Sequence, residues 1–341
     1  MDTLPSQPAL DPVQTLLRIS NGIVQVACLR AALESNAADQ LLSGPKAVAD
    51  IAATAGLNED ALYRCLRVLA AEQIFTEVAP RVFANTDVSA LMVAGHPMKL
   101  RDNLLWGTSK FTFRTFTAFM HSVQTGEPCI EKVFGMPAFE YFPTDPETNT
   151  EFNNGMTAIS AMVVPSVLDS YDFSGIGTLC DVAGGHGFLL TSILAKHPDV
   201  KGILFDLDHV IEGARPRIKQ MVLAGRCTTS SGDFFASVPT ADSYIMKHII
   251  HDWEESRAVT ILTNCAKAMS SDGKILLVEC LIKGLDVPDF GKVLDIFMLT
   301  MPGGKERTEQ EYAKLLAKAG LKINRIVPNR SPLSLIEAVL A

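Results

Sequence analysis

Titratable side chains concentrate in the segment KHIIHDWEES, residues 247–256, where His248 and His251 lie three positions apart. Such a pair could bind a metal ion, provide a catalytic base, or occupy the junction between a strand and a helix cap. If SYIMKHII is extended, His248 lies within the strand and His251 just past its end, so their side chains point in different directions. No third ligand stands at a suitable spacing, and a metal site is not predicted. Asp252 and Glu255 have the spacing of a helix capping box.

Three other motifs place small or acidic residues where a predicted strand ends. DVAGGHG, residues 181–187, joins a buried strand to a helix, and its small residues let the backbone approach a ligand. Asp206 ends the next strand, where a carboxylate can bind two ribose hydroxyls. GDFF, residues 232–235, ends a third strand and offers Asp233 as an acceptor and Phe234 as an apolar face for a flat base. Together these motifs predict a nucleoside site.

The kind of nucleoside follows from what the glycine loop lacks. After Gly185-His186-Gly187 the chain continues Phe-Leu-Leu, so the third glycine of the dinucleotide fingerprint G-x-G-x-x-G is missing. The sequence contains no G-x-x-x-x-G-K-[ST] motif, and the 181–187 loop has no lysine or arginine for a pyrophosphate. NAD and ATP are therefore disfavoured, and a cofactor without phosphate, such as S-adenosylmethionine, is favoured.

The elements that must position these motifs alternate between strands and helices from Asp172 onward. A buried strand is predicted at GTLCDVA, further strands are predicted at KGILFDLD, CTTSSGDFF, SYIMKHII and GKILLVE, and the tail reads as two closing strands. This pattern predicts an α/β fold with a Rossmann-like, doubly wound and mainly parallel sheet. Ligands of such sheets bind outside the carboxyl ends of the strands, at the topological switch point, so the motifs should meet there.

The first hundred residues read instead as helices, including a helix-turn-helix unit. The predicted signals are a helix end at Gly56, a cap at Asn58, a stripe of Leu62, Leu66 and Leu69, and a β-wing over 74–83. DNA binding is disfavoured, because residues 1–100 carry seven lysines and arginines against ten acids, a net charge of −3. Glu59 and Asp60 would also face the phosphates at the end where recognition helices dock. A winged-helix domain used for packing or dimerisation is predicted.

Residues 106–165 are predicted to be helical and are rich in aromatic residues and methionine, with turns at Gly126-Glu-Pro128 and Phe142-Pro143. Each of these side chains could simply pack in a core. Together they would also suit the wall of an apolar ligand pocket. The candidate pocket residues are Trp106, Phe113, Phe116, Met120, Met156 and, farther along the chain, Met298.

The bulk properties set limits on location and partners. A length of 341 residues predicts about two domains, and we expect them at residues 1–105 and 106–341. The net charge of −8 disfavours nucleic acid and anionic membranes as partners. The seven cysteines are scattered without a C-x-x-C motif, and no signal peptide or membrane segment is visible. A cytoplasmic location is expected.

The order of the motifs resembles the S-adenosylmethionine-dependent O-methyltransferases of the plant caffeate and isoflavone, animal hydroxyindole and bacterial polyketide type. The similar segments are ALYRCLRVLA, DVAGGHG, FDLDHV, GDFF, KHIIHDW, KILLVE and GGKERTEQEY, in that order along nearly the whole chain. The resemblance implies a homodimer formed through the N-terminal domain and transfer of a methyl group to a hydroxyl of a small aromatic molecule. The segment DIFMLTMPGGKERT departs from the plant enzymes just before Pro302, so their substrates are not implied.

The resemblance also implies roles for individual residues. His251 matches the general base, and Glu279 and Glu306 match the acids that orient it. Implied cofactor contacts come from Ala183, Gly184, Gly185, Asp206, Leu207, Asp233, Phe234 and Lys247. Ala183 stands where the family usually has glycine, a change that is tolerable if φ is negative there.

Two alternative functions remain open at this point. A protein of this kind could bind S-adenosylmethionine and catalyse another reaction, such as hydroxylation or decarboxylation. It could also be a cofactor-sensing regulator that binds DNA through the winged helix. The presence of His251, Glu279 and Glu306 favours methyl transfer over the first alternative, and the negative charge of the N-terminal domain disfavours the second.

Overall fold

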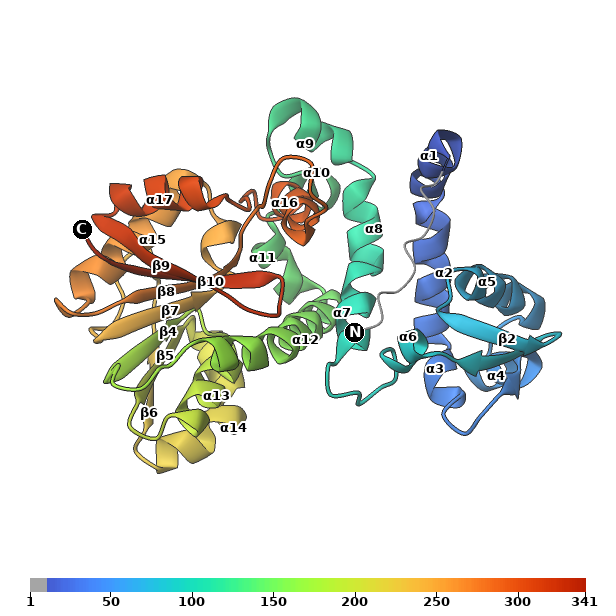
Figure 1. Ribbon diagram of the computed structural model, residues 1–341, viewed down its shortest axis with the longest axis horizontal. Coiled ribbons are helices and arrows are strands. Elements are labelled where there is room, and N and C mark those ends of the chain that lie inside the picture. The colour runs from blue at the N-terminus through green and yellow to red at the C-terminus, as the bar shows by residue number, and fades with distance from the viewer. Residues whose placement is uncertain (1–10) are drawn as a thin grey trace. The chain divides into compact units, whose positions relative to one another are not determined.

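The computed structural model describes residues 11–341 and divides into two units (Figure 1). The first unit ends at Thr112 and the second comprises Phe113–Ala341. The division falls within helix α8, Lys110–Phe116. The domain boundary expected between residues 105 and 106 stays a prediction.

A helix-turn-helix with a β-wing forms the centre of the first unit. Helix α4, Val48–Ala55, ends at Gly56, whose φ of 67° gives the left-handed cap that glycine adopts without strain. Asn58 then accepts a hydrogen bond from Ala61 N and begins α5, Glu59–Ala71, as predicted. The leucine stripe of α5 is buried. The wing consists of β2, Phe75–Ala79, and β3, Val82–Asn85, and β1, Lys46–Ala47, pairs antiparallel with β3.

The acids at the start of α5 are paired within this unit. Glu59 lies 2.8 Å from Arg81 of the wing, and Asp60 lies 2.8 Å from Arg64 one turn along the helix. These carboxylates therefore neutralise the basic side chains beside the helix N-terminus, where a phosphate contact would need them free.

Two further helices precede the helix-turn-helix. Helix α2, Gly22–Glu34, packs against α5, whereas α1, Pro12–Ser20, has no buried residue. The apolar side chains of α1 are exposed, with Leu16 at 71% and Ile19 at 68%. Across the described residues no single helix is long and apolar enough to span a membrane. Helices α1 and α2 together have the length and composition of such a span, but the chain bends by 47° between them. The remaining helices of this unit are α3, Ala37–Gln40, α6, Asp87–Ala90, and α7, Leu100–Gly107.

Helices open the second unit, as the sequence predicted. After α8 come α9, Phe119–Thr125, α10, Ile130–Phe134, α11, Ala138–Tyr141, and the 3₁₀ helix η1, Phe142–Thr144. Gly126 and Gly135 end α9 and α10 with φ of 78° each. Asp145 caps the long helix α12, Pro146–Ser170, which leads into the sheet domain.

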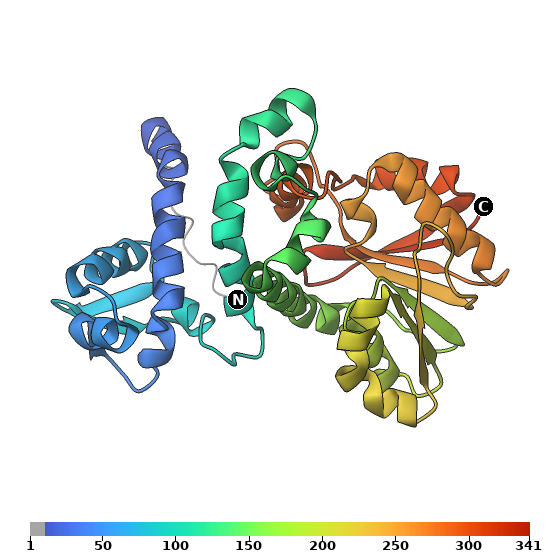
Figure 2. The same ribbon diagram turned by 180° about the vertical axis from the view of Figure 1, so that it is seen from behind.

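A seven-stranded sheet of order β6-β5-β4-β7-β8-β10-β9 forms the rest of the unit (Figures 1 and 2). Strands β4 to β8 are parallel, and β10 runs antiparallel to both β8 and β9. The strands are β4, Thr178–Val182, β5, Lys201–Asp206, β6, Cys227–Ser231, β7, Ser243–Lys247, β8, Ile275–Cys280, β9, Leu321–Pro328, and β10, Leu333–Leu340.

Helices cover both faces of this sheet, which is why its central strands β4, β7 and β8 are largely apolar and buried. Helices α12, α13, Phe188–Lys196, and α14, Asp208–Leu223, pack against one face, and α15, Glu255–Ala268, and α17, Glu309–Lys318, pack against the other. Helix α16, Phe290–Thr300, follows β8. The doubly wound, Rossmann-like fold with an N-terminal winged-helix domain is thus confirmed.

Two local predictions at the end of β7 are wrong. The strand ends at Lys247, so His248 lies outside it, with a φ of 55°. The N-cap of α15 is Glu254, whose carboxylate accepts hydrogen bonds from Ser256 N and Arg257 N. The expected capping box of Asp252 and Glu255 does not form because Asp252 belongs to a short 3₁₀ helix, η2, Ile250–Asp252.

Candidate active site

The topological switch point lies between β4 and β7, which neighbour each other although β5 and β6 come between them in the chain. Strands β5 and β6 follow β4 toward one edge of the sheet, and β8 follows β7 toward the other edge. The loops at the carboxyl ends of β4 and β7 therefore diverge and leave the place where such sheets bind ligands. The glycine loop follows β4, and the histidine segment follows β7.

The glycine loop is held by Asp206 at the end of β5. Its carboxylate accepts hydrogen bonds from Gly185 N at 2.8 Å and from Leu207 N at 2.7 Å. A Cβ on Gly184 would lie 2.6 Å from the carboxyl group of Asp181, whereas a Cβ on Gly185 would meet no atom within 4 Å. Gly184 therefore lets the loop pack on β4, and Gly185 faces open space.

Ala183 does not meet the condition expected of it. Its φ is 53°, in the left-handed region, and not negative. An alanine in this conformation costs about 1–2 kcal/mol relative to the right-handed one. The loop thus keeps the left-handed backbone conformation that glycine favours, although the residue there, Ala183, is strained by it.

Asp181 is a site residue that we did not predict. It is 2% exposed, and its Oδ2 has no hydrogen-bond partner among the described residues. Burial, opposed in part by Lys247 and reinforced by Asp206, raises the pKa of Asp181 to about 7. Burial likewise lowers the pKa of Lys247, against the attraction of Asp181, Glu279 and Asp252. The first D of DVAGGHG was visible in the sequence, but nothing there indicated an unpaired buried carboxyl group.

Aromatic rings from the turn after β6 pack against the residue that follows η2. The ring centroid of Trp253 lies 5.8 Å from that of Phe234 and 4.9 Å from that of Phe235. Arg257 covers this cluster, with its guanidinium carbon 4.2 Å from the Phe235 centroid. Asp233 is exposed and accepts a hydrogen bond from Phe235 N at 2.8 Å. The GDFF turn therefore presents an acid and an aromatic face at one place.

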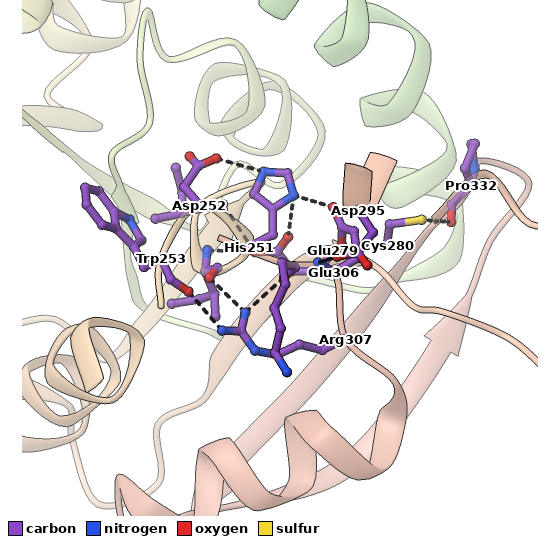
Figure 3. Close-up of polar contacts among 12 residues, drawn as sticks. His251, Asp252, Trp253, Glu279, Cys280, Asp295, Glu306, Arg307 and Pro332 are labelled. Carbon is purple, nitrogen blue, oxygen red and sulfur yellow. Dashed lines mark hydrogen bonds and ion pairs between the residues drawn. The ribbon is translucent and has the colours of Figure 1, made fainter. Parts of the chain in front are cut away.

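His251 is buried on η2 between acids from several segments (Figure 3). Its Nδ1 lies 2.5 Å from Glu306 Oε1 and 3.8 Å from Glu279 Oε2. Its Nε2 lies 3.4 Å from Asp252 Oδ1 on the opposite side of the ring. Lys305 N also donates to the carbonyl oxygen of His251 at 2.8 Å. The pairing of one ring nitrogen with Glu306 fixes the ring orientation and leaves Nε2 for chemistry.

Glu279 connects the end of β8 to the histidine segment. Its Oε1 accepts hydrogen bonds from Ile249 N at 3.2 Å and Ile250 N at 2.9 Å, which fixes the turn before His251. Burial, with repulsion from Glu306 and against the attraction of His251, raises the pKa of Glu279 to about 7.

The pKa values of Glu306 and Asp252 are raised as well. Burial, followed by repulsion from Asp295, raises the pKa of Glu306 to about 8. Burial also raises the pKa of Asp252 to about 6, although the attraction of His251 opposes it. Perturbed pKa values of this kind cluster at functional sites, so the acids around His251 mark a candidate site for proton transfer.

The two histidines of KHIIHDWEES do form a pair, contrary to the prediction that they point apart. Their rings stack with centroids 4.8 Å apart and planes 17° apart. The positive φ of His248 turns its side chain back over His251, which an extended strand would not do. Burial, followed by repulsion from His251 and Lys247, lowers the pKa of His248 well below 6.5, so it is the neutral form that stacks.

The acids also supply ligand atoms that the sequence spacing did not reveal. One ligand atom from each of His251, Glu279 and Glu306 lies within 4.8 Å of the others, a spacing that a metal ion could use. The 2.5 Å contact between His251 and Glu306 is that of a hydrogen-bonded imidazole–carboxyl pair. That this cluster binds no metal ion stays a prediction.

The predicted substrate-pocket residues are only partly brought together. The ring of Phe116 contacts Phe119 and, at 5.4 Å between centroids, Phe297 of α16, the helix that also carries Met298. Met120 is exposed, and Phe113, Met156 and Met298 are half-buried. In the first unit, Trp106 is buried and stacks on Phe111. A pocket formed from these residues stays a prediction.

Comparison with known families matches both parts of the chain. Residues 116–322 match the O-methyltransferase domain, and residues 17–95 match the O-methyltransferase dimerisation domain. The chain is 37% identical over 324 residues to phenazine O-methyltransferase PhzM of Lysobacter antibioticus, covering 95% of each chain.

Solved structures agree over the same length. A crystal structure of LaPhzM superposes with a TM-score of 0.89 at 36% identity, covering 97% of this chain and all of the other. NcsB1, an O-methyltransferase from neocarzinostatin biosynthesis solved with S-adenosylmethionine and 2-hydroxy-5-methyl naphthoic acid, has a TM-score of 0.82 at 29% identity, covering 98% of this chain and all of the other.

Replacing Gly304 with alanine tests how closely the turn that carries Glu306 must approach His251. A Cβ on Gly304 would lie 1.9 Å from the His251 carbonyl oxygen, so the turn must move. We expect a loss of about 1–3 kcal/mol in the free energy of unfolding from overpacking. Displacement of Glu306 should also lower turnover, by on the order of 10²-fold. Chemical unfolding and turnover at a temperature where the variant is folded measure the two effects.

Gly273→Ala is the matched control. Its Cβ would lie 2.0 Å from the carbonyl oxygen of Asp242, at the amino end of β8 and away from His251. It should lose comparable stability but keep the turnover of its folded fraction. Equal loss of turnover in both variants would contradict a specific role for the Gly304 contact.

Glu306→Gln should change how stability depends on pH. Because the folded-state pKa of Glu306 is raised from 4.5 to about 8, its contribution to stability is fully present below pH 4.5 and is lost as pH rises to about 8. That loss can reach about 1.4 kcal/mol per pH unit, and glutamine removes it. Thermal unfolding from pH 5 to 9 should therefore show a shallower decline with rising pH in the variant than in the parent.

Glu337→Gln should change the pH dependence of stability in the opposite direction. Burial alone would raise the pKa of Glu337, but hydrogen bonds from Tyr171, Asn324 and Arg325 outweigh it and lower that pKa. Its contribution is present above the unfolded pKa and lost as pH falls, so glutamine there should mainly cost stability at neutral and alkaline pH.

A Glu306→Gln variant whose stability has the same pH slope as that of the parent would refute the assignment of a buried, proton-retaining carboxyl group to Glu306.

Proposed function

The chain belongs to the family of S-adenosylmethionine-dependent O-methyltransferases, and from this premise we propose that His251 is the general base for methylation of a hydroxyl on a small aromatic molecule. The observation that carries the proposal is the 2.5 Å contact between His251 Nδ1 and Glu306, which occupies Nδ1 and leaves Nε2, on the Asp252 side of the buried imidazole, as the nitrogen that can take a proton. A positioned base of this kind typically contributes about 10²- to 10⁴-fold to the rate.

The residues at the switch point fit the cofactor. Gly185 faces open space, and Asp181 has a buried oxygen without a hydrogen-bond partner among the described residues, so backbone groups and a carboxyl oxygen are available to a ligand there. When bound, S-adenosylmethionine supplies an electrophilic methyl group on a positively charged sulfur. The proposed contacts are Ala183, Gly184 and Gly185 in the loop, Asp206 and Leu207 after β5, Asp233 and Phe234 after β6, and Lys247 at the end of β7.

The protonation of Glu306 decides whether His251 can act as a base. When Glu306 is ionised it accepts the proton of Nδ1–H, and the lone pair of Nε2 is free to take the proton of the acceptor hydroxyl. When Glu306 is protonated it donates to Nδ1, which places the ring proton on Nε2 and blocks proton uptake. Because the pKa of Glu306 is raised to about 8, the competent form should increase as pH rises through that value.

Glu279 and Asp252 have separate parts in this proposal. Glu279 fixes the turn before His251 through Ile249 N and Ile250 N and places a second acid 3.8 Å from Nδ1. A negative charge on that side stabilises the imidazolium that forms when Nε2 is protonated. Asp252, 3.4 Å from Nε2, stands beside the nitrogen that the acceptor hydroxyl must reach.

The apolar helices of the second unit are proposed to hold the acceptor and exclude water. Phe116 and Phe297 pack together, so α8 and α16 supply a common aromatic wall to which Phe113, Met120, Met156 and Met298 add side chains. The neighbour NcsB1 binds 2-hydroxy-5-methyl naphthoic acid, and a flat hydroxylated aromatic molecule of that size suits such a wall. A dry site also strengthens the attraction between His251 and its acids.

A homodimer and a cytoplasmic location complete the proposal. The match to the dimerisation domain and the exposed apolar residues of α1 and α2 support self-association through the first unit. All seven cysteines are free thiols, most of them buried, which supports a reducing compartment.

His251→Ala should abolish most turnover without weakening the cofactor complex. We expect kcat to fall by about 10²- to 10⁴-fold, because only proton transfer is removed. Transfer of a labelled methyl group to a phenol panel that includes 2-hydroxy-5-methyl naphthoic acid measures kcat, and calorimetry measures the S-adenosylmethionine Kd. His96→Ala, on the first unit, controls for loss of a histidine. Equal losses of turnover and cofactor affinity would make His251 structural, and no methylated product from the parent would leave hydroxylation or decarboxylation as the activity.

The double variant Leu16→Glu with Ile19→Glu should dissociate the dimer. Both side chains are exposed on α1, and charges there would have to be buried in an apolar interface. We expect light scattering after size exclusion to change from dimer to monomer mass. Val78→Glu, at an exposed position of β2 in the same unit, should leave the mass unchanged. A double variant that stays dimeric would place the interface elsewhere.

A further inference from the structure

Arg307, which follows Glu306, is the largest charged side chain sealed inside the second unit, at 1% exposure. Its guanidinium donates to three carbonyl oxygens: Nη1 to Ile250 at 3.1 Å and to Lys305 at 3.2 Å, and Nη2 to Trp253 at 2.9 Å (Figure 3). A cation without water is costly to bury unless its donors are satisfied. These bonds explain how it is tolerated, but an apolar side chain would avoid the cost altogether.

The three carbonyl groups flank the two members of the proposed base pair. Ile250 immediately precedes His251 and Trp253 follows it two residues later, while Lys305 immediately precedes Glu306. Nη1 therefore bridges the segment that carries His251 and the segment that carries Glu306. One planar group thereby fixes the separation of two backbone stretches that are distant in the sequence.

The backbone of Arg307 extends the same connection to the third member of the cluster. Its carbonyl oxygen accepts a hydrogen bond from Ile282 N at 3.1 Å, and Arg307 forms a parallel bridge with Leu281, directly beyond β8. Strand β8 carries Glu279. The residue thus connects all three segments that supply His251, Glu306 and Glu279.

We propose that Arg307 is a positioning residue that sets the separation of His251 Nδ1 and Glu306 Oε1 and thereby the basicity of His251. The inference rests on the proposed role of His251. An arginine is required because its rigid fork can donate from one nitrogen to two carbonyl groups and from the next to a third, whereas lysine concentrates its donors at one flexible point.

The charged and titratable groups around His251 define what a pH profile would report. They are Lys247 at the end of β7, His248 directly after it, Asp252 on η2, Glu279 on β8, Asp295 on α16, and Glu306 and Arg307 in the turn. Loosening the His251–Glu306 contact removes the hydrogen bond that stabilises the imidazolium. The ascending limb of the profile should shift, and the plateau should fall.

The test compares Arg307→Met and Arg307→Lys with matched variants of Arg226. Arg226 also donates to two carbonyl oxygens, those of His197 at 2.7 Å and Val200 at 3.0 Å, but at the opposite end of the sheet. Single-turnover rates with S-adenosylmethionine and the best acceptor from the phenol panel are measured from pH 6 to 10. Cofactor affinity and thermal unfolding are recorded for each variant.

Arg307→Met should lower the plateau rate by on the order of 10²-fold and shift the ascending limb, with cofactor affinity unchanged, and Arg307→Lys should restore part of the rate. The Arg226 variants should lose thermal stability without moving the limb. An Arg307→Met enzyme with an unmoved limb, or one whose rate falls only with its folded fraction, would overturn the inference.

A double variant separates this inference from the proposed function. If Arg307 acts through His251, then Arg307→Met should cost little further rate in a His251→Ala background. Full turnover in His251→Ala alone would refute both the base and the positioning role. Loss of turnover in His251→Ala together with a further, independent loss from Arg307→Met would refute the positioning role alone.

Discussion

The buried hydrogen bond between His251 and Glu306 is the constraint around which the second unit is arranged. Neither residue can reach the other unless the turn before Glu306 lies against η2, which the lack of a Cβ on Gly304 permits. Lys305 N then binds the His251 carbonyl group, and Glu279 fixes the turn that precedes His251. The acids gathered there have raised pKa values, so the arrangement proposed to support proton transfer also loses stability as pH rises from about 4.5 to about 8.

The sheet topology explains why these segments meet. Strands β7 and β8 are parallel neighbours, so η2 and the end of β8 project from the same edge. The turn that carries Glu306 returns to that edge through the bridge between Leu281 and Arg307. The glycine loop after β4 lies on the other side of the switch point, which places the proposed cofactor contacts beside the proposed base. Lys247, at the end of β7, lies between the two sets and is attracted by acids of both.

Sequence patterns predicted the features that depend on local chemistry. The Asn58 cap, the Gly56 terminus and the strands of the sheet follow from hydrogen-bonding capacity and apolar patterning, and all are present. The errors lie where tertiary contacts override local preference. His248 leaves the strand with a positive φ and stacks on His251, and Ala183 takes a left-handed conformation that its side chain disfavours. Neither the unpaired oxygen of Asp181 nor the bridging role of Arg307 has any local signature.

The distribution of charge divides the site into two chemical halves. The glycine loop side uses backbone groups, Asp206 and Asp181, with Lys247 as the nearby cation. We propose that this side holds S-adenosylmethionine, which carries a positively charged sulfur and no phosphate. The His251 side concentrates Glu279, Glu306 and Asp252 within a dry interior, where their charges act strongly on the imidazole. In the proposed reaction, an acceptor that loses a proton to His251 would place a positive charge among those acids. The protein thus meets that charge with groups already fixed in place, rather than with water that must reorganise.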